Sequence, residues 1–191
     1  MRGARVLMDR DGVNVLPFLP MLMGNCLSTF GVLLLCTQYR ALALRRQASQ
    51  DPLTGLLNRR GFMERCVTAP KQGALVVLDL DDFKQINDRH GHEAGDRVLA
   101  AVGAYLAGQG DLVASRFGGE EFVLLLPEGD ALAQQARCEQ IRQGIATLPL
   151  DGIQVTASLG LVPYARGWHL DTLFGQADRA LYQAKRSGKN R

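Results

Sequence analysis

Carboxylates stand at the ends of two short apolar runs. Asp79 closes the run ALVVL (74–78), and Glu120 and Glu121 follow two glycines, Gly118 and Gly119. A carboxylate at the end of a buried strand is held rigidly and meets solvent, which suits a hard cation such as Mg²⁺. Glycines beside it let the backbone come close to a ligand. Each feature alone is typical of an ordinary turn, but together they predict a site that holds one or two Mg²⁺ against a triphosphate.

The elements that must position these carboxylates alternate between apolar runs and amphipathic segments. We expect strands over 74–80 and 153–162, a hairpin that pairs 112–117 with 120–127 across the glycines, and helices over 56–69, 83–90, 97–108, 131–146 and 169–188. This order predicts an α+β fold. Its mixed or antiparallel central sheet would carry packed helices in a ferredoxin-like or palm-like arrangement.

An uncharged apolar run, VLPFLPMLMGNCLSTFGVLLLC (15–36), precedes this alternating region. A helix of that length covers about 33 Å, enough for a bilayer core of roughly 30 Å. Arg40, Arg45 and Arg46 follow it, so the positive-inside rule places the following side in the cytoplasm. A signal peptide and a buried core helix are the alternatives, but the run is long and no small-residue cleavage site follows it.

The sequence therefore divides into four parts: a short tail (1–14), a transmembrane helix (15–36), a helical stalk (37–50) and a folded domain (51–191). The stalk is rich in Ala, Leu, Arg and Gln, and Asp51-Pro52 ends it because a residue before proline disfavours the helical region. We expect the protein in the inner (cytoplasmic) membrane, with a single span and the folded domain in the cytoplasm.

Composition and charge exclude several classes of protein. The hydrophobic fraction of 47% and the charged fraction of 21% are those of a globular chain, so disorder and collagen-like repeats are excluded. Residues 1–48 carry six Arg and two Asp, whereas the rest is close to neutral. The folded domain lacks the basic stripe of a nucleic-acid binder, and we expect no nucleic-acid partner. The four cysteines have no CxxC spacing, which argues against a disulfide framework or a zinc site.

The spaced motifs of the folded domain are more specific than any one of them. They are DPLTGLLNRR (51–60), DLDDFKQIND (79–88), GHEAGD (91–96), RFGGEEF (116–122), ASLG (157–160), ADRALYQAK (177–185) and GKNR (188–191). Over about residues 49–191 this pattern resembles the GGDEF domain of the diguanylate cyclase family, in a Gly-Gly-Glu-Glu-Phe form.

The resemblance implies a reaction in which two GTP give cyclic di-GMP and two pyrophosphates. Two domains, each with one GTP, would face each other as a homodimer. Asp79, Glu120 and the Leu80 carbonyl would hold Mg²⁺, with Mn²⁺ as a substitute, and two cations would stabilise the charge that builds on the attacked α-phosphate. The turn Gly118–Glu121 would be the catalytic segment, with Glu120 as the candidate base for the 3′-hydroxyl.

The resemblance also implies substrate contacts from four of the motifs. These residues are Phe83, Lys84, Asn87, His92, Asp96, Lys185 and Lys189. The three lysines would contact phosphates. Asp96 would accept from guanine N1–H and the 2-amino group, Asn87 would donate to O6 or N7, and His92 would support them. Adenine presents an acceptor at N1 and lacks the amino group, so the pair predicts selectivity for guanine.

Two positions depart from the family pattern. Many members carry Arg-x-x-Asp a few residues before the glycine pair, where product binds and inhibits. Here the usual spacing gives Gln109 and Leu112, and a one-residue insertion gives Gly108 and Asp111, so no Arg is present in either alignment. We therefore expect weak product inhibition. Lys189 stands where the family often has Arg, which keeps the charge and loses the bidentate fork.

Two other functions remain open. A catalytically weak or inactive GGDEF domain would bind GTP or a partner as a regulatory module; the complete Gly-Gly-Glu-Glu-Phe run and Asp79 argue against it. A palm-like cyclase acting on ATP would share the two-metal chemistry; Asn87 and Asp96 argue against that one.

Overall fold

The computed structural model describes residues 19–47, 49–165 and 167–191, and the chain forms two compact units, residues 1–46 and 47–191. The predicted tail (1–14) and the first four residues of the predicted span (15–18) lie outside the described residues. The helix α1 (Leu19–Gln47) belongs to the first unit except for its last residue, and the predicted stalk is helical until four residues before Asp51. Within the described residues, no helix meets the length and hydropathy needed to cross a membrane.

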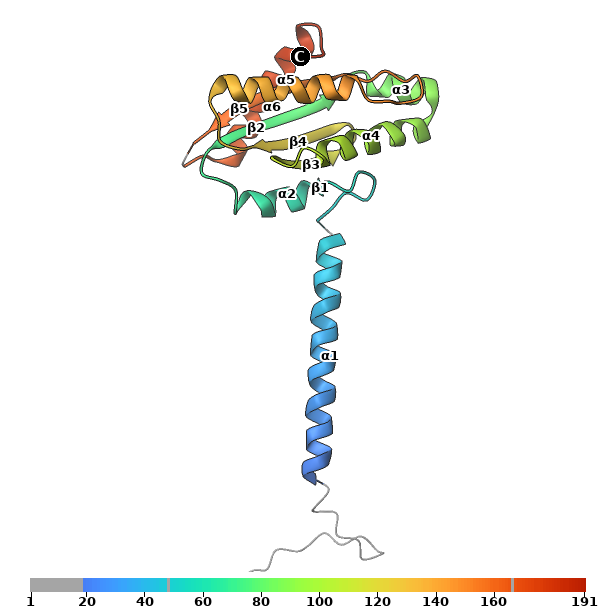
Figure 1. Ribbon diagram of the computed structural model, residues 1–191, viewed down its shortest axis with the longest axis vertical. Helices are drawn as coiled ribbons and strands as arrows, with labels where there is room; N and C mark the ends of the chain where they lie inside the picture. The colour runs from blue at the N-terminus through green and yellow to red at the C-terminus, as the bar shows by residue number, and fades with distance from the viewer. Residues whose placement is uncertain (1–18, 48, 166) are drawn as a thin grey trace, which may run out of the picture. The chain divides into compact units, whose positions relative to one another are not determined.

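The second unit is built on a five-stranded mixed sheet with the order β1-β3-β4-β2-β5 (Figure 1). Its strands are β1 (Leu57–Asn58), β2 (Gly73–Leu80), β3 (Val113–Gly118), β4 (Glu121–Leu126) and β5 (Ala157–Tyr164). β1 runs parallel to β3, and the other neighbours are antiparallel. β2 lies inside the sheet and is buried at all eight positions, which explains its apolar run from Ala74 to Leu78, and Asp79 is the one charged residue in it.

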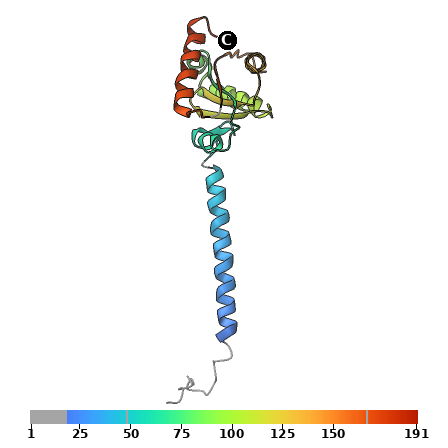
Figure 2. The same ribbon diagram turned by 90° about the vertical axis from the view of Figure 1, so that its left-hand side faces the viewer.

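Helices cover both faces of this sheet. They are α2 (Arg59–Cys66), α3 (Phe83–His90), α4 (His92–Ala107), α5 (Ala131–Ala146) and α6 (Leu170–Arg186). One core joins α3, α4 and α5 to alternate residues of β2 such as Val76 and Leu78. The other core joins α2 and α6 to the intervening residues, such as Leu75 and Val77. Figure 2 shows α6, in red, on the side of the sheet opposite α5.

The predicted α+β fold is confirmed, with three corrections to its elements. The helix expected over 56–69 is shorter, because Leu57 and Asn58 pair with β3 and Asn58 caps α2 by accepting from Gly61 N. The helix expected from residue 97 begins at His92, and the expected glycine turn reduces to Gly91, whose φ of 83° separates α3 from α4. The last strand runs over 157–164 rather than 153–162.

Candidate functional site

The end of β2 brings together the two carboxylate motifs found in the sequence. Asp79 pairs in register with Glu121, the first residue of β4. The next residue, Leu80, donates its backbone N–H to the Glu120 carbonyl at 3.3 Å. Alternation along the strand turns Leu80 into the α3–α5 core, so Asp79 lies on the α2 and α6 face of the sheet. Asp79 and Glu120 are 41 residues apart in the sequence, and the pairing of β2 with β4 brings them to the same end of the sheet.

The glycine pair shapes the turn between β3 and β4. Gly118 and Gly119 have φ values of 146° and 54°, in the region that favours glycine. The pairing shifts register between Arg116 and Gly118, so Phe117 is the extra residue of a β-bulge. Bulges re-aim the residues that follow them, and here the next side chains are the two glutamates of the turn and of β4. The predicted hairpin is present, with this bulge at its tip.

A lysine from α6 pairs with the buried carboxylate. Lys185 Nζ lies 2.7 Å from Asp79 Oδ1, and the Asp79 residue is only 7% exposed. Desolvation raises the pKa of Asp79 above its ordinary value; Lys185 opposes this, and the neighbouring Glu120 and Asp81 add to it. The pKa of Glu121 is raised by desolvation and by Asp79, Asp178 and Glu120. Several carboxylates at this end of the sheet therefore lie within electrostatic reach of the Lys185 ammonium.

A second layer of polar contacts fixes the segment that follows β2. Asp81 is buried and accepts from Ser158 Oγ at 2.7 Å, Thr156 Oγ1 at 2.8 Å and the Asn190 backbone N–H at 3.0 Å. Asp82 adopts φ 53° at the start of α3 and accepts from Lys189 Nζ at 2.6 Å. The predicted phosphate ligands Lys185 and Lys189 are therefore both anchored beside the end of β2.

The predicted guanine contacts lie on α3 and α4. Asn87 is half-buried and packs against Gly95, where an added Cβ would lie 1.9 Å from Asn87 Oδ1. Gly95 thus makes room for the Asn87 side chain. Asp96 follows Gly95 in α4 and is exposed, as are His92 at the start of α4 and Lys84 in α3. Phe83 is buried at 6% exposure and belongs to the core beneath these residues.

The predicted metal ligands are two carboxylates and one backbone carbonyl. Among the described residues, no group of three or more His, Cys, Asp and Glu side chains has the geometry of a metal site. The predicted set needs fewer side chains, because it consists of Asp79, Glu120 and the Leu80 carbonyl. Asp79 and Glu120 are close enough to raise the pKa of Asp79 by repulsion. Two crowded carboxylates beside a backbone carbonyl are oxygen donors that suit a hard divalent cation.

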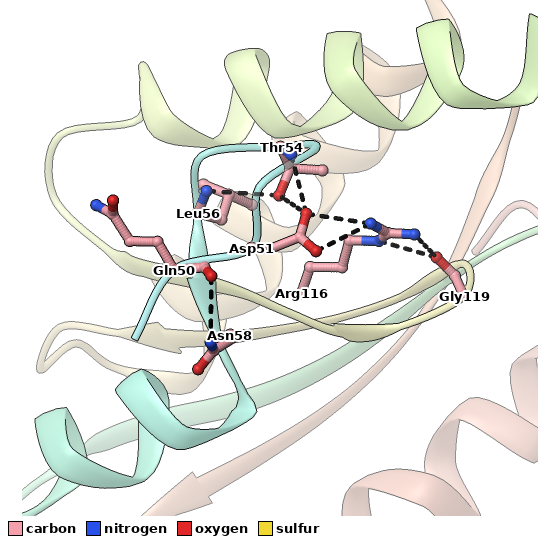
Figure 3. Close-up of polar contacts among 7 residues, drawn as sticks. All are labelled: Gln50, Asp51, Thr54, Leu56, Asn58, Arg116 and Gly119. Carbon is pink, nitrogen blue, oxygen red and sulfur yellow. Dashed lines mark hydrogen bonds and ion pairs between the residues drawn. The ribbon is translucent and has the colours of Figure 1, made fainter. Parts of the chain in front are cut away.

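An ion pair that the sequence did not reveal supports the turn from the other side (Figure 3). Arg116 donates from Nη1 to both oxygens of Asp51 at 3.1 Å, and from Nε and Nη2 to the Gly119 carbonyl at 3.0 and 2.9 Å. The two charged residues are 65 positions apart, so no local pattern connects them. In the sequence, they are marked only by belonging to the motifs DPLTGLLNRR (51–60) and RFGGEEF (116–122).

Sequence comparisons find relatives for most of the chain. Residues 48–191 match the family model described as diguanylate cyclase, GGDEF domain. The chain is 41% identical over 161 residues to diguanylate cyclase DgcM of Escherichia coli, covering 78% of this chain and 38% of DgcM. It is 40% identical over 161 residues to diguanylate cyclase DgcP of Pseudomonas aeruginosa, covering 77% of this chain and 24% of DgcP. The similarity thus spans well under half the length of these two relatives.

Solved structures have the same architecture. The coiled coil and GGDEF domain of DgcB from Caulobacter crescentus, in complex with c-di-GMP, superposes with a TM-score of 0.79 at 29% identity. That superposition covers 88% of this chain and 97% of the other. A microbial GGDEF domain solved with cyclic di-GMP superposes with a TM-score of 0.67 at 35% identity, covering 78% of this chain and 97% of the other.

Proposed function

Because the chain belongs to the GGDEF family of diguanylate cyclases, we propose that residues 51–191 condense two GTP into cyclic di-GMP and two pyrophosphates. One observation carries the proposal. Asp79 and the turn Gly118–Glu121 meet at one end of the sheet, and Lys185 pairs with Asp79 there. Asp79 is buried, its pKa is raised and a partly exposed lysine pairs with it, a combination that is typical of functional sites.

We assign the binding of Mg²⁺ to Asp79, Glu120 and the Leu80 carbonyl. When bound, the cation stabilises the negative charge that develops on the attacked α-phosphate. Desolvation raises the pKa of Asp79 and of Glu121, and repulsion from neighbouring carboxylates adds to this, a repulsion that a bound cation would relieve. Glu120, at the turn beside the end of β2, is the group we assign to take the proton from the 3′-hydroxyl.

We assign the triphosphate to Lys185, Lys189 and Lys84. Lys185 and Lys189 contact Asp79 and Asp82 through ion pairs. An ion pair of this kind holds a long side chain close to the place where phosphate oxygens arrive, which lowers the entropy lost on binding. Lys84 is exposed on the first turn of α3, two residues after Asp82, and its assignment depends on that position.

We assign the guanine base to Asn87 and Asp96, with His92 beside them and Phe83 beneath. The amide and the carboxylate follow one another across the α3–α4 junction, and Gly95 gives the amide its space. Asp96 can accept two hydrogen bonds from the guanine edge, whereas adenine offers it an acceptor at N1. A site of this kind discriminates because the wrong base leaves polar groups unpaired.

Two copies of the chain are needed for one turnover, because each domain has one set of base-binding and phosphate-binding residues. We propose a homodimer whose sites face each other. We also propose that the segment 15–36 anchors the protein in the inner membrane with the domain in the cytoplasm; this proposal depends on the sequence of that segment. Detergent extraction of the full chain from washed membranes tests the anchor, and release into buffer alone contradicts it.

The activity is tested by incubating the full chain with GTP and Mg²⁺ and identifying products by mass spectrometry, with GTP binding measured in parallel by equilibrium dialysis. Cyclic di-GMP as the product supports the proposal. Binding without turnover would instead indicate a regulatory GTP-binding module. Equal turnover of ATP would indicate a cyclase of different base specificity.

A further inference from the structure

The guanidinium of Arg116 joins the turn to the segment where the domain begins (Figure 3). Nε and Nη2 both donate to the Gly119 carbonyl, and Nη1 donates to both carboxylate oxygens of Asp51. The side chains of Arg116 and Asp51 are 12% and 18% exposed. Water therefore competes weakly for the bonds to Asp51, which are partly buried, whereas the bonds to the Gly119 carbonyl lie at the surface.

The Gly119 end of this contact adds a side-chain restraint to a turn that is otherwise held by the Gly118–Glu121 pairing and by the Leu80 N–H bond to the Glu120 carbonyl. Both glycines of the turn have positive φ, and an added Cβ at either position would meet no atom within 4 Å. Glycine has more accessible backbone conformations than other residues, so a turn made of two glycines can adopt many conformations. Two hydrogen bonds to the Gly119 carbonyl select one of them, and Glu120 is the next residue.

The Asp51 end is itself fixed. Asp51 Oδ1 accepts from Thr54 N–H at 2.9 Å and from Thr54 Oγ1 at 2.7 Å. The loop closes through two backbone bonds, from Asp51 N–H to the Leu56 carbonyl and from Gly55 N–H to the Asp51 carbonyl. Thr54 packs on α4 at Gly103, where an added Cβ would lie 2.6 Å from Thr54 Cβ. Asp51 is thus a rigid support for the arginine.

We propose that Arg116 is a positioning residue that holds the Gly118–Gly119 turn, and that Asp51 acts through Arg116 to set the place of Glu120. The inference relies on the function proposed for Glu120. Asp51 lies in the first residues of the domain. Its ion pair with Arg116, and the bonds from Arg116 to the Gly119 carbonyl, connect this first segment to the turn. Only arginine suits this role, since its planar fork serves two acceptors at once, whereas lysine presents a single charged point.

The test compares full-length R116K and D51N with the wild type, and with R60K as the matched control. Arg60 forms an exposed ion pair with Glu64 within α2. Hydrogen–deuterium exchange is measured at the Leu80 amide, which donates to the Glu120 carbonyl, and over residues 118–121. Steady-state kinetics with GTP give kcat and KM for each variant.

We expect R116K and D51N to speed exchange at these amides and to lower kcat by roughly tenfold or more, equivalent to about 1.4 kcal/mol. The KM for GTP should stay within about twofold, because the proposed GTP contacts on α3, α4 and α6 are untouched. The double variant should be no worse than R116K, since Asp51 acts through Arg116. R60K should match the wild type in both measurements.

Unchanged exchange at the turn in both variants would overturn the proposal. A fall in thermal stability with unchanged kcat would also overturn it, because that is the result of a merely structural ion pair. If R116K does not fold, D51N keeps the side-chain shape of Asp51 and decides the question by the same readouts. A wild-type chain without cyclase activity refutes the proposed function, and the exchange data still decide whether Arg116 holds the turn.

Discussion

Lys185 Nζ lies 2.7 Å from Asp79 Oδ1, which joins the last helix of the domain to the end of its central strand. The resemblance implied different roles for these residues: Lys185 as a phosphate contact and Asp79 as a Mg²⁺ ligand. In the structure they are partners. Substrate and cation each compete with one half of this pair, so we expect binding of the two to be coupled. The pair also compensates the buried charge of Asp79 with an ammonium that is still partly exposed.

Asp79→Asn and Glu120→Gln should each lower cyclic di-GMP formation by roughly a hundredfold or more, the scale of losing a charge-stabilising group in an active site. Both substitutions keep the size of the side chain, so circular dichroism should match the wild type. Asp171→Asn, an exposed acid in the first turn of α6, is the control and should keep full activity. Retained turnover in Glu120→Gln would refute its assignment as ligand and base.

Gly95→Ala should weaken GTP binding, because the new Cβ would lie 1.9 Å from Asn87 Oδ1 and displace that side chain. Gly175→Ala is the matched control: it is also a helical glycine, its Cβ meets nothing within 4 Å, and it should leave binding unchanged. Such a change in an open helix position gains about 0.5–1 kcal/mol of stability. Equilibrium dialysis with GTP measures both variants. Equal affinity of Gly95→Ala and the wild type would remove Asn87 from the base site.

Asp51 predicts a pH dependence of stability. Partial burial alone would raise its pKa, but hydrogen bonds from Thr54 and Arg116 outweigh burial and hold the pKa below the ordinary value of 3.8. The carboxylate therefore stabilises the fold above that value, and this contribution is lost as the pH falls through the lowered pKa. Asp51→Asn should cost about 1.5–3 kcal/mol near neutral pH, the scale of hydrogen bonds to a charged group.

Chemical unfolding of the wild type and Asp51→Asn across an acid series checks this prediction. The difference in unfolding free energy should be constant above about pH 5 and should shrink below it, because fewer molecules then carry the charge. A difference that is independent of pH would show that the charge of Asp51 contributes nothing, and that only its shape matters.

Product inhibition should be weak. The positions where the family pattern calls for Arg are Gly108 or Gln109, and Asp111 is instead paired with Arg137 of α5 at 2.5 Å. Loss of one bidentate cation costs roughly 1.5–3 kcal/mol, or about tenfold to a hundredfold in affinity for cyclic di-GMP. Initial rates at several GTP levels with added product decide the point. Strong non-competitive inhibition at low micromolar product would indicate a product site built from other residues.

The sequence predicted the parts of the fold whose signals are local. The hairpin at 113–126 is marked by glycines that its turn requires, and α3 over 83–90 by its apolar spacing. β1 was missed because two residues carry no periodicity, and its pairing partner lies in β3. The start of α4 was missed because Gly91 and Gly95 read as a turn, whereas Gly95 is helical and makes room for Asn87.

The candidate site was predictable in its residue types and not in its contacts. Asp79 and the glycine turn follow from motif and strand pattern, but the pairing of Lys185 with Asp79 depends on how α6 packs across β2 and β5. The Asp51–Arg116 pair depends on a bulge and a loop closure that are 65 residues apart. Such contacts follow from tertiary packing, which no local spacing encodes.

Facing sites in a dimer make the rate depend on association. In a chain that starts at residue 47, cyclic di-GMP formation per protomer should rise with protein concentration and level off once dimers dominate. The full chain should show a smaller change, provided that the N-terminal segment raises the effective concentration of domains. Rates over a wide dilution series, with mass measured by light scattering, test this. A flat rate from a fragment that stays monomeric would contradict a two-domain mechanism.

The central claim is that the carboxylates at the end of β2 and in the Gly118–Glu121 turn drive the condensation of two GTP. Its most direct test measures both products of one reaction, cyclic di-GMP and pyrophosphate, from the full chain with GTP and Mg²⁺. The account predicts two pyrophosphates for every cyclic di-GMP, and a loss of both products by roughly a hundredfold or more in Asp79→Asn. GTP left intact by the wild type, or pyrophosphate released without cyclic di-GMP, would contradict it.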